Sequence, residues 1–379
     1  MASSIESLPP GILAYILSRT PVKTIVYSKC VCKKWRSLLS EPYFVDLHLS
    51  RSHTCLVIHQ EGSLSKCNIF KLGELEDKPD SFNIYHDPVM KIKFGLGFRY
   101  SVMHLSGTIN GLTCIWHYSG SDETYICNPV TREYTLLPEH KIIRKPLPAV
   151  SYGFGFIAAR NQYKVVRFYQ GGYPLNQDLY KSDCEVYTLG TGMWRSLGQV
   201  PVGLGGCQNG VFLNGNLHWL AHDQHHITSD LVCTFDLERE FSELAASAPL
   251  VDENMNSAFR SLGVLGGCLC LCDNTSECEF VIWVRQDYGM KECWTKEIVI
   301  ENDFETQLYK TVHVLTVLTG GSILMVVHNG HMFTYHRESK TLQRLDISWT
   351  KDFSICNVMV YVPSFIRLKS FMSERVLIF

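Results

Sequence analysis

The sequence predicts a mainly β protein with a small α-helical module at its N-terminus. Residues 1–50 would form the helical module, residues 51–363 a β-propeller of six blades, and residues 364–379 a helical tail. Apolar residues recur at helical spacing within residues 8–38. After Ser50, short β-branched or aromatic runs alternate with clusters of Gly, Asn, Asp and Pro, which is typical of an all-β domain. A weak repeat in these runs favours a propeller.

The predicted helices of the N-terminal module are short and are separated by prolines. Pro9 and Pro10 precede the first pattern, because proline is tolerated at the first position of a helix. Pro21 separates the first pattern from the second. The apolar positions are Ile12, Leu13, Ile16 and Leu17, then Val22, Ile25 and Val26, then Cys30, Val31, Trp35 and Leu38. Since a module of about 45 residues rarely buries enough surface to be stable alone, these positions indicate a partner.

The β region contains six similar units. Each has a short apolar strand, a polar turn and a second strand led by an aromatic or bulky residue. The leading residues are Phe82, Tyr134, Trp194, Phe241, Trp294 and Leu342, which lie 47 to 60 residues apart. Blades of the kelch type repeat at about 50 residues, whereas WD-type blades are shorter. The spacing therefore favours a kelch-like propeller of six blades over a pair of β-sandwiches.

Ring closure and crowding near the propeller axis predict further details. A propeller leaves few open sheet edges, so we expect strand 357–362 to pair with residues 55–59. The pairs Asn110-Gly111, Asn209-Gly210, Gly266-Gly267 and Gly320-Gly321 are expected in inner strands near the axis.

The junction at residues 47–53 has little Gly or Pro and predicts a stiff connection. The tail spaces Phe365, Leu368 and Val376 at helical intervals, and packing on the preceding domain is favoured over a membrane-surface helix.

Composition narrows the class of protein. The net charge of −2 argues against a nucleic-acid-binding protein that relies on bulk electrostatics. The first ten residues have neither a basic region nor an apolar core, so no signal peptide is expected. Fifteen cysteines scattered through apolar runs indicate reduced thiols, and no apolar run reaches transmembrane length. We expect a protein of the cytoplasm or nucleus that does not enter a membrane.

The sequence has only weak signals of catalytic or metal-binding sites. Cys268, Cys270 and Cys272 alternate on a predicted strand, whereas structural zinc sites use Cys pairs separated by a turn. His222, His225 and His226 fall in a predicted loop without a completing ligand. The motifs of hydrolases, zinc proteases and phosphate-binding loops are missing. We therefore expect neither catalytic residues, nor a metal, nor a cofactor.

The N-terminal module resembles an F-box. That family pattern begins with Leu-Pro, continues with paired aliphatics and Pro-Val-Lys/Arg, and ends in Val-Cys-Lys-x-Trp. The matching residues are Leu8, Pro9, Ile12, Leu13, Ile16, Leu17, Pro21, Val22, Lys23, Val31, Cys32, Lys33 and Trp35. Ser28-Lys29-Cys30 replaces the common Arg-x-Arg. The resemblance implies docking onto the Skp-type adaptor of a cullin–RING ubiquitin ligase, with these positions, the two lysines apart, as the adaptor contacts.

A second resemblance covers roughly residues 100–363. The segments ICNPVTREYTLLPE, NGNLHWLA and CNVMVYVPSF resemble, in order, the F-box-associated domain of plant F-box proteins. In that family the domain is a kelch-like propeller that selects substrates. Together the two resemblances imply a substrate receptor of a Skp–cullin–F-box (SCF) ubiquitin ligase, which recruits a protein target for degradation and leaves ubiquitin transfer to the RING-bound conjugating enzyme.

Aromatic and histidine residues in predicted loops or strand ends are the candidates for target binding, because aromatic anchors carry much interface energy. They are Trp116, Tyr118, Tyr169, Tyr173, His222 and His225. Three alternatives stay open at this point. The chain could be an enzyme on a kelch-type propeller, a glycan-binding F-box receptor, or an F-box protein that acts outside a ligase.

Overall fold

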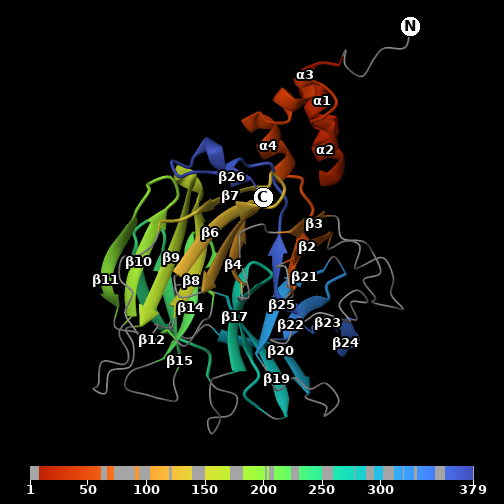
Figure 1. Cartoon of the computed structure of the whole chain (residues 1–379). Helices are drawn as coiled ribbons and strands as arrows, with labels where there is room; N and C mark the ends of the chain where they lie inside the picture. The colour runs from red at the N-terminus through yellow and green to blue at the C-terminus, as the bar shows by residue number, and fades with distance from the viewer. Residues whose placement is uncertain are drawn as a thin grey trace.

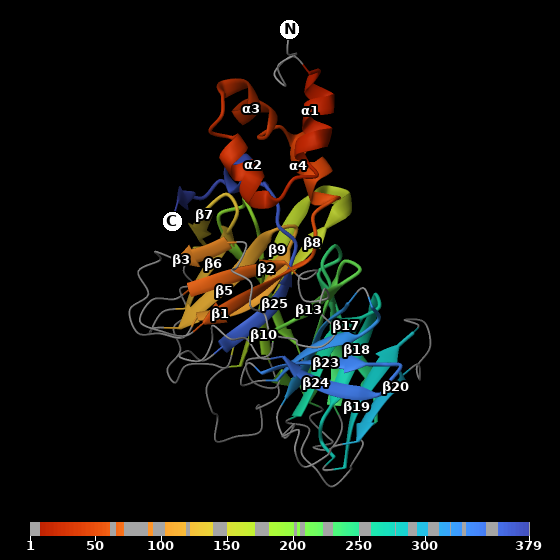
Figure 2. The same ribbon diagram turned by 90° about the vertical axis from the view of Figure 1, so that its right-hand side faces the viewer.

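The structure is a computed structural model in which a helical module stands on one face of a β-propeller (Figures 1 and 2). It describes residues 8–60, 66–71, 90–93, 103–118, 122–138, 150–170, 182–200, 203–204, 209–222, 230–249, 259–276, 278–286, 294–301, 311–318, 320–327, 331–345 and 355–378. Within these ranges, no helix has the length and apolar character that crossing a membrane requires.

The described part of the helical module has four helices, one more than predicted. They are α1 (Pro10–Leu17), α2 (Val22–Ser28), α3 (Lys33–Leu38) and α4 (Pro42–Leu49). Pro10 and Pro42 stand in the first turn of α1 and α4, where the missing N–H costs nothing. Cys32 is the N-cap of α3, and its Sγ accepts a hydrogen bond from the Trp35 backbone N–H at 3.5 Å.

Within the described residues, the strands form six antiparallel sheets, which we number as blades in chain order. Blade 1 contains β25 (Ile355–Tyr361), β1 (Cys55–Gln60), β2 (Lys66–Lys71) and β3 (Met90–Lys93). Blade 2 contains β4 (Met103–Ile109), β5 (Leu112–Tyr118), β6 (Asp122–Asn128), β7 (Glu133–Leu136) and β26 (Leu377–Ile378). Blade 3 contains β8 (Val150–Ile157), β9 (Gln162–Gln170), β10 (Ser182–Thr188) and β11 (Trp194–Val200).

The remaining blades follow the same order from inner to outer strand. Blade 4 contains β12 (Gly203–Leu204), β13 (Val211–Leu213), β14 (Asn216–His222), β15 (Asp230–Asp236) and β16 (Phe241–Ala246). Blade 5 contains β17 (Arg260–Leu265), β18 (Cys268–Asp273), β19 (Glu279–Arg285) and β20 (Trp294–Glu301). Blade 6 contains β21 (Val312–Val317), β22 (Ile323–Val327), β23 (Met332–His336) and β24 (Thr341–Leu345). The prediction of a mainly β chain with a propeller is confirmed.

Five of the six residues that lead the sequence units lie in the fourth strand of successive blades. They are Tyr134 in β7, Trp194 in β11, Phe241 in β16, Trp294 in β20 and Leu342 in β24. Phe82 belongs to a segment that the structure does not describe. The predicted ring closure is also confirmed: β25 pairs antiparallel with β1, so that Cys55 faces Tyr361 and His59 faces Asn357.

Apolar side chains from adjacent blades meet between them and form the core of the ring. Between blades 3 and 4, for example, the ring of Phe168 lies edge-on to Trp219 and Phe235, with centroids 4.9 and 6.3 Å apart. Trp219 also covers Gly210, where an added Cβ would lie 2.5 Å from the indole. This agrees with the expected crowding at that glycine.

For the other glycine pairs the prediction is wrong. They lie not in inner strands but in the connections that follow those strands. Asn110 and Gly111 have φ values of 51° and 81°, and Gly266 and Gly267 have 59° and 81°. Two successive residues with positive φ form the tight turn that suits the twist of a β-hairpin. These glycines are therefore explained by the hairpins that join the first and second strands of blades 2 and 5, not by crowding at the axis.

The strand directions give the propeller two distinct faces. Strand β1 begins at Cys55, directly after the helical module, so it runs away from the module. Because blades repeat around one axis, the second strands β5, β9, β14, β18 and β22 run the same way. We call the face beside the module the proximal face, and the face where the second strands end the distal face.

Residues 362–378, which we call the strap, follow β25 and cross the proximal face (Figure 1). The predicted helical tail is wrong here. The strap has a single 3₁₀ turn, η6 (Leu368–Ser370), and ends in β26, which adds to the edge of β7. Proximal hairpins offer hydrogen-bond partners along its length, and these hold it extended instead of helical.

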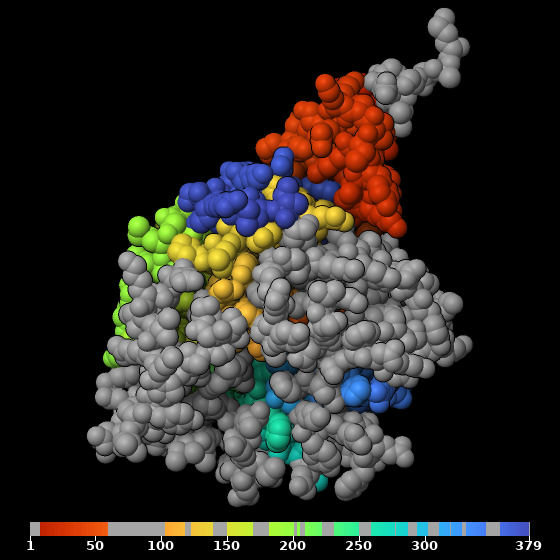
Figure 3. Space-filling view, viewed as in Figure 1, coloured from red at the N-terminus to blue at the C-terminus, as the bar shows by residue number. Residues whose placement is uncertain are grey.

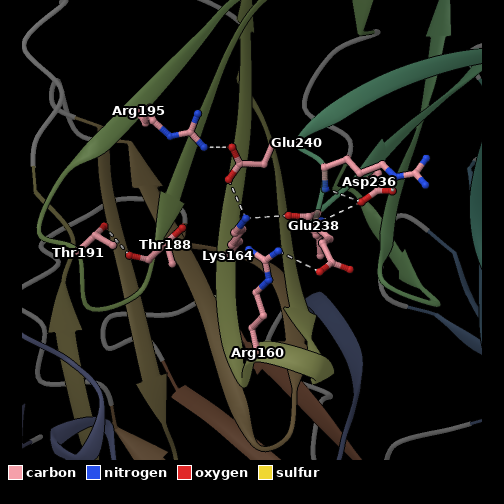
Figure 4. Close-up of polar contacts among 10 residues, drawn as sticks. Arg160, Lys164, Thr188, Thr191, Arg195, Asp236, Glu238 and Glu240 are labelled. Carbon is pink, nitrogen blue, oxygen red and sulfur yellow. Dashed lines mark hydrogen bonds and ion pairs between the residues drawn. The ribbon is translucent and has the colours of Figure 1, made fainter.

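A group of charged residues fastens blade 3 to blade 4 on the proximal face (Figure 4). The Lys164 Nζ donates to the Leu237 carbonyl and to Glu240 Oε1, both at 2.7 Å. Arg195 also contacts Glu240. At the rim, Arg160 and Glu238 form a solvent-exposed pair at 3.1 Å. Lys164 is buried, so its charge is balanced across the junction between the two blades.

Candidate functional surfaces

The helical module concentrates exposed apolar side chains. In the described chain, six of the twelve exposed large hydrophobic residues lie between positions 12 and 43. They are Ile12, Tyr15, Ile16, Tyr27, Val31 and Tyr43. Apolar exposure gathered on one small module is typical of a protein-binding surface.

Helix α1 has one apolar face in the module core and a second that faces outward. Leu13 and Leu17 are buried, at 0% and 5% exposure, whereas Ile12 and Ile16 are 49% and 41% exposed. Tyr15, at 45%, follows Ile12 by three residues and shares its face. We call Ile12, Tyr15 and Ile16 the α1 ridge. It is a short row of apolar side chains that stay largely exposed among the described residues.

Two arginines hold the ring of Tyr15. The guanidinium carbons of Arg19 and Arg51 lie 4.2 and 4.4 Å from its centroid. Arg51 also donates to Ser18 Oγ at 2.8 Å, so its position is fixed from two sides. Sequence reasoning missed Tyr15, although its place three residues after Ile12 is the signal that assigns it to the same face.

The residues of the F-box-like pattern occupy three different environments. Pro9, Ile12, Ile16, Pro21 and Val31 are exposed, Leu8, Val22 and Cys32 are half-buried, and Leu13, Leu17 and Trp35 are buried. The buried three build the core of the module. Cys32 has a structural role as the cap of α3. The pattern thus mixes residues that fold the module with residues that are free to meet a partner.

The candidate target-binding residues are dispersed between the core and the distal face. Trp116 is not in a loop but in β5, 7% exposed, with its ring stacked on His104 at 4.3 Å and on Tyr152 at 5.4 Å. Its indole packs blade 2 against blade 3. Tyr169 is half-buried near the end of β9. Tyr118 and His222 end β5 and β14, without described side chains, and Tyr173 and His225 lie outside the described ranges.

Topology nevertheless brings the described strand-end candidates, Tyr118, Tyr169 and His222, to one side of the molecule. Strands β5, β9 and β14 are the second strands of blades 2, 3 and 4, and all three end on the distal face. The distal face lies opposite the α1 ridge and the rest of the helical module (Figure 1).

A polar group at the distal end of blade 2 was not foreseen from the sequence. His117 faces Glu123 across β5 and β6, with Nδ1 3.8 Å from the carboxylate. Tyr125 donates to the same carboxylate at 2.8 Å. Burial and the neighbouring Glu123 raise the pKa of Tyr125, and burial lowers the pKa of His117. Alternation within β6 places Glu123 and Tyr125 on one face, which is the signal that sequence reasoning could have used.

The cysteines of β18 have the environment of a packed strand. Cys270 and Cys272 are buried and Cys268 is half-buried, all as free thiols. Hydrogen bonding to Cys272 and burial raise the pKa of the Cys270 thiol well above its ordinary value. Over the part of the chain that the structure describes, no group of three or more His, Cys, Asp or Glu side chains could hold a metal ion.

Comparison with known proteins agrees with this architecture. A family model of the F-box domain matches residues 5–47, and one of the F-box associated beta propeller domain matches residues 60–368. The F-box protein At3g07870 of Arabidopsis thaliana is 28% identical over 364 residues, covering 86% of this chain and 84% of that protein.

Two further relatives from Arabidopsis thaliana share most of their length with this chain. The F-box/kelch-repeat protein At3g23880 is 27% identical, with 78% of this chain and 80% of that protein covered. The F-box protein CPR1 is 25% identical, with 90% and 85% covered. The N-terminal helices, the propeller and these matches together place the chain in the family of plant F-box proteins that carry an F-box-associated β-propeller domain.

Proposed function

We propose that this chain is the substrate receptor of an SCF ubiquitin ligase. The helical module would bind a Skp-type adaptor and, through it, the cullin and RING subunits. The distal face of the propeller would bind a protein target. The chain itself would be non-catalytic, with ubiquitin transferred by the RING-bound conjugating enzyme, and it would act in the cytoplasm or nucleus.

The α1 ridge is the observation that carries this proposal. Burial of an aliphatic or aromatic side chain contributes about 1.5–3 kcal/mol, so the three ridge residues with Val31 and Pro9 can supply a stable interface. Tyr15 adds a ring whose position the two arginines already fix, which lowers the entropy cost of binding. The proposed adaptor contacts are therefore the exposed members of the F-box pattern together with Tyr15.

The placement of the two surfaces supports a division of labour. An adaptor on the helical module and a target on the distal face would occupy opposite ends of the receptor, so neither would block the other. A ligase of this kind works by proximity, because it raises the effective concentration of a target lysine near the ubiquitin thioester. Such a mechanism needs no catalytic residue in the receptor.

Co-purification of the full chain with a Skp-type adaptor tests the proposal. We expect the wild-type chain to form a complex, and an Ile12→Glu, Ile16→Glu variant to lose at least about 30-fold in affinity, since hot-spot residues contribute about 2 kcal/mol or more. The matched control is Val299→Glu, a charge placed at a propeller position with 44% exposure. This control should bind like wild type.

The folded state must be checked beside binding. Circular dichroism and thermal unfolding should be unchanged in the double variant, because both substitutions are at exposed positions. Loss of binding by the ridge variant alone supports the adaptor site. Wild-type protein that does not bind the adaptor, or a ridge variant that binds as tightly as wild type, would refute it.

A further inference from the structure

The strap contacts both the helical module and the propeller. Figure 3 shows its atoms between the module and blades 2 and 3 on the proximal face. The peptide connection between the module and β1 is only residues 50–54. Within it, Ser52 donates to the carbonyl of Pro363 in the strap at 2.8 Å. The connection is thus itself fastened to the strap.

Phe365 is the strap residue that enters the module. It is 1% exposed, and its ring meets three side chains of the module. The His48 ring lies edge-on at 4.9 Å between centroids, the Phe44 ring lies at 6.2 Å, and the Lys29 Nζ lies 4.5 Å above the Phe365 ring. Lys29 follows α2, whereas the other two belong to α4. One propeller-side ring therefore packs against the end of one helix and the face of another.

The backbone on both sides of Phe365 is held by blade 2. Asn128 Nδ2 donates to the carbonyls of Ser364 and Ile366, at 3.1 and 2.7 Å. Glu133 accepts a hydrogen bond from the Leu368 N–H at 2.7 Å. Because these bonds flank Phe365, the ring projects from a fixed segment and not from a free tail.

Glycine at position 111 allows the strap to lie this close. Gly111 has a φ of +81°, and a Cβ there would lie 2.2 Å from Ser364 Oγ. The Tyr361 hydroxyl donates to the Gly111 carbonyl at 3.2 Å. A larger residue would displace the strap next to Phe365. The hairpin of blade 2 is therefore shaped for the strap as well as for its own turn.

The middle of the strap, after η6, touches blade 3. The ring of Phe371 stacks on Tyr163 at 5.6 Å, and Ser373 Oγ donates to the Gly190 carbonyl at 2.8 Å. Phe371 makes a contact of the same kind as Phe365, but with the propeller alone. It provides an internal comparison for the role of Phe365.

We propose that Phe365 is a positioning residue, and that the strap, through it, fixes the orientation of the helical module relative to the propeller. The sequence predicts a stiff connection at residues 47–53, but residues 50–54 belong to neither a helix nor a strand, so on their own they would let the module pivot. The coupling does not depend on the proposed receptor role. Its consequence, a fixed distance between an adaptor-bound enzyme and a target on the distal face, rests on that role.

Distance distributions between two spin labels test the orientation directly. The labels are attached through unnatural amino acids at Ser37 in α3 and Gln199 in β11, both exposed, in the full chain. We expect a single narrow distribution in the wild type. Phe365→Ala should widen it about twofold or shift it, because the ring that packs the strap between α2 and α4 would be lost from the core that joins the module to the propeller. Phe371→Ala should leave it narrow.

Two measurements keep this test independent of folding and of ligase activity. Phe365→Leu keeps an apolar side chain between the helices and should restore most of the narrow distribution. Affinity for a Skp-type adaptor should be unchanged in Phe365→Ala, since no ridge residue is altered. A distribution as narrow as wild type in Phe365→Ala would overturn the proposal. Equal broadening by Phe371→Ala would also overturn it, because general loosening of the strap would then be the cause.

Discussion

The helical module and the propeller bury their apolar side chains in different ways. Each pair of adjacent blades shares a core of its own, as Phe168 and Trp219 do between blades 3 and 4. The core of the module is continuous with blades 1 and 2 and includes Tyr361 and Phe365. The module also leaves its α1 ridge uncovered. The propeller is thus closed on itself, whereas the core of the module is completed by the blades below it and one face of α1 stays exposed.

Breaking a buried contact inside the closed ring should therefore lower the stability of the whole chain, and this is the largest effect that we expect. Arg260 and Asp273 form an ion pair with both side chains at 0% exposure and 3.1 Å between Nε and Oδ2. Asp273→Ala leaves a buried charge without its carboxylate, and the free energy of unfolding should fall by about 3–5 kcal/mol. Urea unfolding followed by tryptophan fluorescence measures it.

The double variant Arg260→Met, Asp273→Leu is the control for this effect. It removes both charges together, so most of the loss should be recovered. If the module depends on the ring for support, adaptor binding should be lost at the same urea concentration at which the ring unfolds. Binding that persists beyond that point would break the comparison.

Two adjacent residues of α1 allow the stability of the module and its adaptor binding to be tested separately. Leu13→Ala opens a cavity in the core and should cost about 2–5 kcal/mol of stability. Ile12→Ala truncates an exposed side chain and should change stability by less than about 0.5 kcal/mol, while it weakens adaptor binding. Thermal unfolding and adaptor titration of the same two variants check this. Equal stability losses would show that Ile12 is not a surface residue of the folded module.

The sequence was sufficient for the order of the strands because an aromatic residue recurs at the start of the fourth strand in blades 2 to 5, with Leu342 near that position in blade 6. Tyr134, Trp194 and Trp294 mark that position, and the pairing of β25 with β1 follows from the need to close a ring. The strap was mistaken for a helix because Phe365, Leu368 and Val376 fit a helical period by chance. Their actual spacing reflects separate contacts, of Phe365 with the module and of Leu368 and Val376 with the core shared by blades 2 and 3, which no local pattern encodes.

The candidate surfaces were predicted less well, for a physical reason. An F-box pattern does not distinguish buried residues from exposed ones: Leu13 and Trp35 are buried in the core of the module, whereas Ile12 is exposed and available for contact. Trp116 looked like a loop aromatic because His117 and Tyr118 follow it, yet strand alternation turns it into the contact between two blades. Only burial distinguishes these cases.

Buried histidines in each region provide the next test. Burial lowers the pKa of His48 in the module and of His218 in blade 4 from 6.5 to about 4. Between these pH values the unfolded chain binds a proton that the folded chain does not, so stability rises with pH. As the pH falls from 6.5 to about 4, each histidine should remove about 3 kcal/mol of stability.

Variants at the two positions separate the regions. His48→Gln and His218→Gln should each flatten the fall in stability across this pH range, measured by urea unfolding at several pH values. If the module and propeller unfold together, both variants will flatten the same single transition. Two separate transitions, with His48→Gln affecting only the first, would show that the module melts alone and that the strap couples it only weakly.

The smallest expected effect comes from the charged group between blades 3 and 4 (Figure 4). It tests whether a contact within the ring contributes more to stability when it is more deeply buried. Arg160 and Glu238 are more than half exposed, so Arg160→Ala should change stability by less than about 0.5 kcal/mol and the effect should vanish in high salt. Lys164 is buried and bridges the blades. Lys164→Ala should lower the free energy of unfolding by about 2 kcal/mol. This is less than the loss expected on breaking a buried pair whose remaining charge has no other partner, because Glu240 keeps Arg195 as a partner. A salt-dependent loss of equal size in both variants would mean that the two blades are held by surface charge and not by a buried bridge.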